Sequence, residues 1–148
     1  MLIEIKVKVA RNIDNRTRKR TETYLINKEF FSEAEYQIMS NLNEESNSKL
    51  IEEYEVQSLR ISPIKEVAFQ NEGDFTFIAT LKDIWLETDG TEKQLKYKVL
   101  LWAKNLTEAN TKAQQLAKQG YDMQIEGLKQ VDYEYLNSNI TEEEINND

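Results

Sequence analysis

The stretch YLINKEFFSEAE, residues 24–35, decides how this chain is organised, because a similar stretch, VLLWAKNLTEAN, follows at residues 99–110. Each begins with apolar residues typical of a strand and continues into a hydroxyl residue followed by Glu-Ala, which is typical of a helix start. Each stretch is therefore predicted to be a strand that turns into a helix. The two junctions divide the chain into two similar halves.

The first half is predicted to contain two strands, a helix and a third strand. From Leu2 to Val9, apolar and charged residues alternate, as in a strand with one buried face. Residues 10–17 are predicted to be a polar turn, and residues 18–26 to return as the second strand of a hairpin. The remaining expected elements of this half are a helix capped by Ser32, a strand at 50–61 and a short extended piece at 64–69.

The second half repeats this order. Its strongest turn signal is Asp89-Gly90, a dipeptide that closes tight hairpins. Gly120 is predicted to end the second helix in the left-handed conformation, and Gly127 to mark a bulge in the closing strand. The other expected elements are strands at 75–87 and 93–103, a helix capped by Thr107, and a closing strand that begins at Tyr121.

These patterns predict an α+β fold of tandem strand-strand-helix-strand halves, with antiparallel sheet and two covering helices. The halves are expected at residues 1–70 and 71–136. Because each would bury little apolar surface alone, they are expected to share one globular domain or to pair with another chain. Residues 137–148 are acidic and nearly free of apolar residues, which predicts a disordered tail.

The sequence contains no His and no Cys. Their absence removes Ser-His-Asp and Cys-His nucleophile systems, and every zinc site that depends on imidazole or thiolate. Carboxylate chemistry, alone or with Mg²⁺, and Lys, Tyr or Ser chemistry remain possible. We therefore expect a protein that is not an enzyme and has no cofactor.

Charge is unevenly distributed along the chain. The net charge is −8, yet residues 1–20 carry seven bases and two acids, so that a basic hairpin precedes an acidic body. An acidic body repels nucleic acid at long range, which makes nucleic acid an improbable partner. No stretch has the length and apolarity of a membrane span or a signal peptide, and without Cys nothing points to an oxidising compartment. We therefore expect a cytoplasmic protein with no membrane partner.

Several motifs resemble those of an uncharacterised domain family found in gut bacteria and their phages. TETYL at 21–25 and FSEAE at 31–35 are similar to a strand and a helix start of that family. Glu66-Val67 and EGD at 72–74 lie where the family has a Glu-Val-Phe and a Glu-Gly-Asp. The resemblance covers about residues 1–136 and weakens at 132–136. It brings no catalytic residue, and it implies a phage or mobile-element setting.

The first candidate site is the basic cluster of the hairpin. Arginine presents a planar fork that suits phosphate, so such a cluster could hold a nucleotide or a phosphate backbone. The alternative is a solvated hairpin tip whose charges discourage pairing at a strand edge. The cluster consists of Arg11, Arg16, Arg18, Lys19 and Arg20.

The second candidate site is an aromatic set. Such rings could stack on a base, and Trp102 is followed by Lys104, which places a ring and a cation on one side of a strand end. The alternative is that these rings pack the sheet or an oligomer interface. The set consists of Trp85, Tyr97, Trp102, Tyr133 and Tyr135.

Acidic residues form the third candidate. They could bind Mg²⁺, but none has a recognised metal-ligand spacing, so surface acids are the favoured interpretation and no metal site is expected. No glycine-rich phosphate loop exists, because the four Gly are scattered. The acids considered are Glu52, Glu53, Asp74, Asp83, Asp132 and Glu134.

The leading hypothesis is a small non-enzymatic binding protein of a phage or mobile element. It would sequester a nucleotide-type signal of host defence, in a pocket of Arg and aromatic side chains at the interface of a homo-oligomer. An interaction or structural accessory module is the alternative, and a carboxylate-dependent hydrolase is disfavoured. The ligand-binding residues expected are Arg11, Arg18, Arg20, Trp102, Lys104 and Tyr133.

Overall fold

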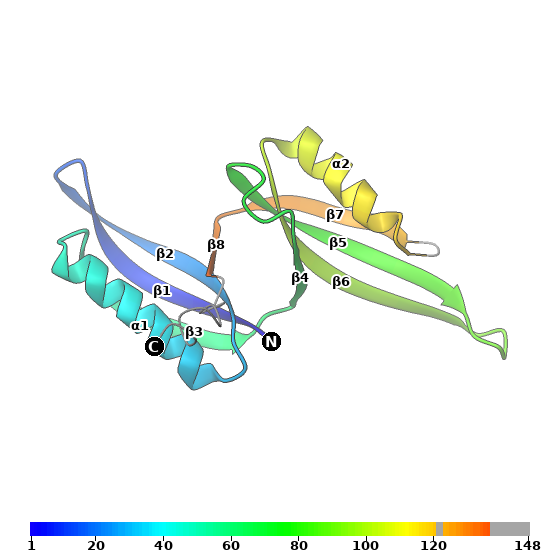
Figure 1. Cartoon of the computed structure of the whole chain (residues 1–148), viewed down its shortest axis with the longest axis horizontal. Helices are drawn as coiled ribbons and strands as arrows, with labels where there is room; N and C mark the ends of the chain where they lie inside the picture. Colours follow the sequence, from blue (N-terminus) through cyan, green and yellow to red (C-terminus); the bar gives the residue numbers. More distant parts are fainter. Residues whose placement is uncertain (121–122, 137–148) are drawn as a thin grey trace, which may run out of the picture. The chain divides into compact units, whose positions relative to one another are not determined.

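A computed structural model describes residues 1–120 and 123–136. The expected tail at 137–148 and the expected start of the closing strand at Tyr121 lie outside the described residues. The model contains eight strands and two helices in the described part, and none of those helices is long and apolar enough to cross a membrane (Figure 1). The elements are β1 (Leu2–Ile13), β2 (Arg16–Asn27), α1 (Phe31–Asn47), β3 (Ile51–Ile61), β4 (Ile64–Ala68), β5 (Phe75–Leu86), β6 (Glu92–Ala103), α2 (Leu106–Ala117), β7 (Met123–Val131) and β8 (Tyr133–Leu136).

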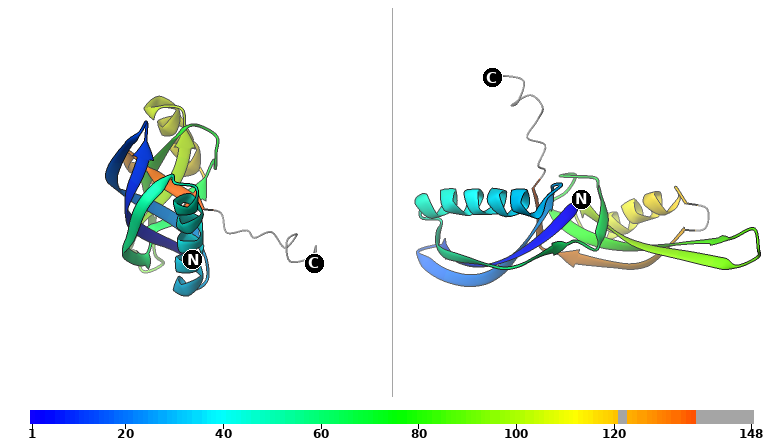
Figure 2. Two further views of the ribbon diagram at one scale, coloured as in Figure 1. Left: turned by 90° about the vertical axis from the view of Figure 1, so that its left-hand side faces the viewer. Right: turned by 90° about the horizontal axis from the view of Figure 1, so that it is seen from below.

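The described residues form two sheets, each of four strands with one helix along one face (Figure 2). The first sheet has the order β3-β1-β2-β8 and the second β4-β6-β5-β7. Within each sheet the hairpin and the strand after the helix pair antiparallel, as the alternating patterns predict. The predicted α+β fold of tandem strand-strand-helix-strand halves is confirmed.

Both sheets are mixed, because one edge strand of each pairs parallel, in addition to the antiparallel pairing expected from the sequence. β8 runs parallel to β2, and β4 runs parallel to β6. The reason is the path of the chain. β4 follows β3 in sequence but joins the second sheet, and β8 follows β7 but joins the first, so neither can form a hairpin with its sheet neighbour.

Because of these two crossings, the chain divides into two units that differ from the halves expected from the sequence. Unit 1 contains Met1–Ser62 and β8, and unit 2 contains Pro63–Asp132. The expected boundary at 70/71 assigned β4 to the first half. In the structure, the register that pairs Val67 with Leu100 assigns β4 to unit 2.

The two units carry the same irregularity at the same place. The register of β1 with β3 shifts between Lys6 and Val7, and the register of β5 with β7 shifts between Thr80 and Leu81. The second shift lies beside Gly127 and confirms the predicted bulge. Val7 and Leu81 therefore occupy equivalent positions, which supplies a structural alignment of the two hairpins.

Each helix covers its sheet with a stripe of buried side chains, and each stripe packs into a separate apolar core. In α1 the buried residues are Ala34, Ile38 and Leu42, and in α2 they are Ala109, Ala113 and Leu116. The first core also contains Ile3, Ile5, Val7, Val9, Tyr24 and Ile26, and the second contains Phe77, Ala79, Leu81, Val99 and Leu101.

The helix ends differ from those expected. Ser32 is already helical; α1 begins at Phe31, and its N-cap residue Phe30 makes no side-chain capping bond. In α2 the cap is not Thr107, because the Oδ1 atom of Asn105 accepts the Glu108 N–H at 2.8 Å. A capping side chain must precede the first helical residue, and both hydroxyl residues lie too far along the chain.

The turns of the two hairpins follow from residues that tolerate positive φ. Asp14 and Asn15 have φ angles of 51° and 63°, which makes a two-residue hairpin loop and extends both strands into the expected turn at 10–17. Gly90 has a φ angle of 86° and confirms the predicted turn. Gly120 does not adopt the left-handed conformation predicted for it.

Candidate functional site

The basic hairpin of unit 1 carries its arginines on the face that packs against α1. The register places Arg18 directly opposite Arg11, and Arg20 opposite the buried Val9. Arg16, Arg18 and Arg20 alternate along β2 and so share this face. The structure therefore gathers three of the six predicted ligand-binding residues, namely Arg11, Arg18 and Arg20, and adds Arg16. We call these four residues the arginine face.

Arg11 is held by carboxylates on two elements. Its Nε and Nη2 atoms donate to the two oxygens of Glu22, at 2.5 and 2.7 Å, and Nη1 donates to Glu45 of α1 at 2.7 Å. Only 15% of its side chain is exposed. Hydrogen bonding to Glu22, opposed by burial and reinforced by Glu45, raises the pKa of Arg11 above its usual value. Arg11 thus fastens the hairpin to the helix.

Glu22 is the centre of this cluster. One of its oxygens also accepts from Arg20 at 2.6 Å, and the other accepts from the hydroxyl of Tyr24 at 2.6 Å. Burial alone would raise the pKa of Glu22, but hydrogen bonds from Arg11, Tyr24 and Arg20 lower it to about 2. Burial, and then the hydrogen bond to Glu22, raise the pKa of Tyr24. Glu22 is therefore ionised and holds two arginines at fixed positions.

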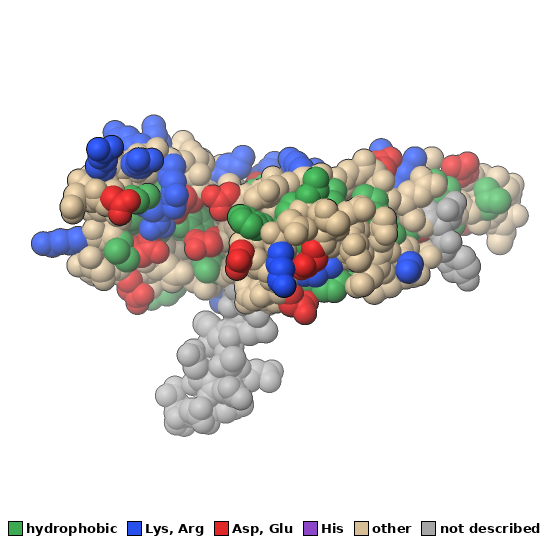
Figure 3. Space-filling model, turned by 90° about the horizontal axis from the view of Figure 1, so that it is seen from above, with side chains coloured by type: hydrophobic (Ala, Val, Ile, Leu, Met, Phe, Trp, Pro, Cys, Tyr) green, Lys and Arg blue, Asp and Glu red, His purple; other side chains and the backbone are tan. Residues whose placement is uncertain are grey.

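Arg16 and Arg18 are exposed, and within the described part of the chain neither has a carboxylate partner. Glu22 and Glu45 pair with Arg11 and Arg20, so Arg16 and Arg18 add positive charge that these two carboxylates do not neutralise. Lysine and arginine side chains gather at this end of unit 1 in the space-filling view (Figure 3). The two open guanidinium groups can each offer a planar pair of donors to a phosphate or carboxylate.

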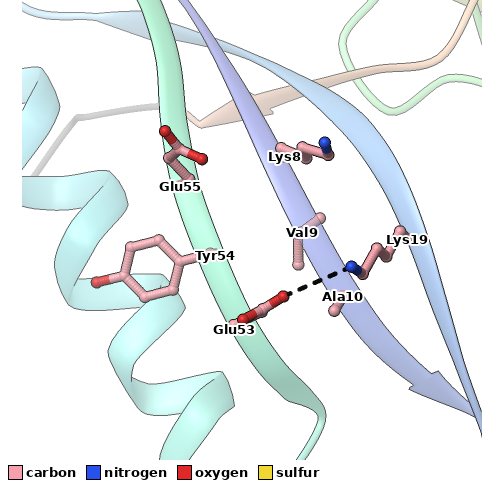
Figure 4. Close-up of a pocket in the computed structure, with 7 residues that line it drawn as sticks. All are labelled: Lys8, Val9, Ala10, Lys19, Glu53, Tyr54 and Glu55. Atoms are coloured by element: carbon pink, nitrogen blue, oxygen red, sulfur yellow. Dashed lines mark ion pairs between the residues drawn. The ribbon is translucent and has the colours of Figure 1, made fainter.

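The opposite face of the same sheet contains a hollow of about 260 Å³ (Figure 4). Its floor includes Ala10, the small residue of the central strand, which is 3% exposed. Across it, the Nζ atom of Lys19 lies 4.0 Å from Glu53. Lys8 and Glu55 complete the charged rim, which carries two positive and two negative groups. The sequence analysis missed this hollow; its signal was a small residue, Ala10, two positions after Lys8 on the same face of the strand.

Tyr133 lies in unit 1, but on the face that points away from α1. Tyr133 is part of β8 and pairs with Thr23 of β2. Burial, and then the negative charge of Glu4, raise the pKa of Tyr133. Glu4 is 1% exposed and accepts from the Nε atom of Arg60 at 2.6 Å. Tyr133 therefore belongs to a cluster around Glu4 and not to the arginine face.

Trp102 and Lys104 lie in unit 2. Trp102 is 8% exposed, so little of its ring is open for stacking on a base, although it is not among the residues of the second core. Lys104 is exposed just beyond β6. The six predicted residues thus divide among three places: the arginine face, the Glu4 cluster and the end of β6.

A polar anchor in unit 2 was not predicted. The Nζ atom of Lys112 donates to the backbone oxygens of Glu72 and Trp102, at 2.7 and 2.8 Å, and lies 2.9 Å from Glu108. The same ammonium lies 5.3 Å from the centre of the Phe69 ring. With these partners Lys112 is occupied, and it ties the loop before β5 to α2 and β6.

No group of three or more acidic side chains within the described ranges is arranged to hold a metal ion. Among the acids considered from the sequence, Glu53 faces Lys19, and Asp83 of β5 pairs with Leu95 of β6 in the strand register.

A family profile described as "Domain of unknown function (DUF4494)" matches residues 1–136. The chain belongs to this family. The match has the extent expected from the sequence resemblance and spans both units of the DUF4494 chain, from β1 through β8. Neither the curated proteins nor the solved structures gave a match. Membership in DUF4494 assigns no activity.

Proposed function

We propose that this DUF4494 protein is a non-enzymatic binding module that captures a small anionic ligand of nucleotide type on the arginine face. The observation that carries this proposal is the pair of open guanidinium groups, Arg16 and Arg18, beside Arg20 on one strand face. Alternate residues of a strand are spaced by roughly 7 Å, and arginine side chains are long enough for neighbouring guanidinium groups to converge on one multiply charged anion. A ligand with two or three phosphates carries such a concentration of negative charge.

The ion pairs of the cluster support ligand capture, because they reduce the conformational entropy that the hairpin would lose when a ligand binds. Glu22 holds Arg11 and Arg20, and Glu45 connects Arg11 to α1, so the strand beneath the open arginines is rigid. Binding energy is then not spent on organising the backbone. Charge-assisted hydrogen bonds from Arg16 and Arg18 contribute the attraction.

The composition supports binding over catalysis, because the sequence lacks both His and Cys. The net charge of −8 supports a small ligand over a long nucleic acid, which the acidic remainder of the chain would repel. The resemblance to a family of gut bacteria and their phages supports the biological setting that we propose: a phage or mobile-element protein that acts in the host cytoplasm and removes a nucleotide signal of defence.

Calorimetric titration with a panel of nucleoside mono-, di- and triphosphates and cyclic dinucleotides tests this proposal. We expect at least one multiply phosphorylated member to bind, and Arg18→Gln to weaken that binding roughly tenfold or more, the value of one charge-assisted hydrogen bond. Lys19→Gln is the matched control, since it removes the same charge from the same strand on the opposite face. Equal losses in both variants, or no binding to any member, would overturn the proposal.

A protein-interaction function is the second candidate, and a separate observation favours it. On the β5–β6 hairpin of unit 2, Trp85 and Leu95 are 38% and 54% exposed. Large apolar side chains that gather on a surface commonly mark a contact with another protein.

A further inference from the structure

The outer part of the β5–β6 hairpin presents apolar side chains beyond the end of α2. Trp85 and Leu95 lie on the face of the hairpin that carries Leu81 and Tyr97, because each is an even number of residues away along its strand. Leu81 and Tyr97 pack in or against the core of unit 2. The core-facing side of the hairpin thus continues outward as an exposed apolar surface.

In unit 1, the equivalent position on the hairpin is covered by the unit's own helix. Arg11 follows Val7 by four residues, and Trp85 follows the equivalent Leu81 by four, so the two side chains occupy equivalent positions. In unit 1, the last turns of α1 reach this position, and Glu45 binds Arg11. α1 has 17 residues and α2 has 12, a difference of roughly 7 Å in length. Within the described residues, α2 ends before Trp85.

The four side chains of this surface form a checkerboard. In the register of β5 with β6, Asp83 stands opposite Leu95, and Trp85 stands opposite Lys93. The two apolar residues therefore occupy one diagonal, and the two charged residues occupy the other. Lys93 is exposed, and the Oδ1 atom of Asp83 is buried without a hydrogen-bond partner in the described part of the protein. We call these four residues the checkerboard surface.

We propose that the checkerboard surface binds a second copy of this chain. A two-fold axis along the Trp85–Leu95 diagonal would place each apolar side chain over its counterpart, and Lys93 of each copy beside Asp83 of the other. Rows within the sheet are roughly 5 Å apart across strands and 7 Å along them, and the long lysine side chain spans the remaining offset.

Charge complementarity favours a second copy over other occupants. A purely apolar partner would desolvate Lys93 and Asp83 and leave both without a counter-charge, which is costly. The same surface, rotated onto itself, supplies both the apolar contact and both counter-charges, as an isologous dimer interface requires. This dimer involves no residue of the arginine face, so a test of the dimer is independent of a test of ligand capture.

Sedimentation velocity of the full chain over a range of concentrations tests the dimer. We expect a monomer–dimer equilibrium that Trp85→Ser weakens at least about tenfold, as expected for a central aromatic contact. Leu86→Ser is the matched control: Leu86 is 72% exposed and adjacent to Trp85, but its side chain points to the other face. A wild-type protein that stays monomeric, or equal effects of the two substitutions, would overturn the proposal.

A charge exchange identifies the pairing itself. Asp83→Lys alone and Lys93→Asp alone should each disfavour the homodimer, because each places like charges against one another. Mixing the two variants should restore dimers, since each then meets its opposite charge across the axis. Thermal melting of each variant shows whether it is folded. Failure of two folded variants to associate on mixing would contradict the proposed geometry.

Discussion

The outer ends of the two hairpins occupy equivalent places in two units of the same topology, yet they carry opposite chemistry. At the end of β1–β2, Arg11, Glu22 and Glu45 form a network of ion pairs that joins the hairpin to α1. At the end of β5–β6, Trp85 and Leu95 are exposed beyond a shorter helix. In our proposals each unit binds a partner at this place, and the length of the helix and a few side chains decide which kind of partner it is.

The comparison also shows where each unit depends on single residues. Unit 1 depends on Glu22, which satisfies Arg11, Arg20 and Tyr24 together. Unit 2 depends on the close approach of the backbone at Gly73 to the backbone at Ala103. A Cβ atom at Gly73 would lie 2.4 Å from the carbonyl carbon of Ala103. A substitution at either position should therefore destabilise one unit and leave the stability of the other unchanged.

The largest effect is expected from Gly73→Ala. The added methyl group overlaps the backbone of Ala103, which cannot move away as a flexible side chain would. We expect a destabilisation of about 3 kcal/mol. Hydrogen exchange should show the loss of protection in β5 and β6, with β1 and β2 unchanged. Equal loss in both hairpins would show that the units unfold together.

A somewhat smaller effect, on the other unit, is expected from Glu22→Ala. It leaves Arg11 and Arg20 without their shared carboxylate in a half-buried position, which should cost about 2–3 kcal/mol. Protection should fall in β1 and β2 and remain in β5 and β6. Lys19→Ala serves as the control, because its ion pair with Glu53 is exposed and should contribute little.

The pH dependence of unit 1 should follow Glu22. Its pKa is about 2 in the folded chain against an ordinary value of 4.5, so its ionised form contributes stability that is fully present above pH 4.5. That contribution is lost as the pH falls towards 2, and we expect a loss of about 2 kcal/mol after allowance for solvent screening. Urea titrations between pH 5 and pH 2 measure it. An equally steep acid loss in Glu22→Gln would assign the effect to another carboxylate.

Much of the fold could be predicted because both hairpins alternate apolar and polar residues over many positions. The strands of β1–β2 and β5–β6 follow from that alternation, and the buried stripes of both helices follow from apolar residues spaced one helical turn apart. The parallel edge strands could not be predicted, because β4 and β8 have five and four residues and either could have extended its own half. Their sheet is chosen by pairing with distant residues, which local patterns do not encode.

The candidate site was predictable in part for a similar reason. Strand alternation places Arg18 and Arg20 on one face, and the hairpin register adds Arg11. The second carboxylate partner of Arg11 is Glu45, 34 positions away on α1, and no sequence spacing signals that contact. The burial of Trp102 could not be predicted either, because a tryptophan near a strand end can be buried or exposed with the same local sequence.

Native mass spectrometry of the full chain, purified rapidly from cells in which it is active, tests most directly the claim that the two hairpin ends bind different things. It reports the number of subunits and any retained small molecule in one spectrum. We predict a wild-type dimer with a bound anion, a dimer without the anion for Arg18→Gln, and a monomer that keeps the anion for Trp85→Ser. A single variant that abolished both, or a wild-type protein that is monomeric and empty, would contradict the account.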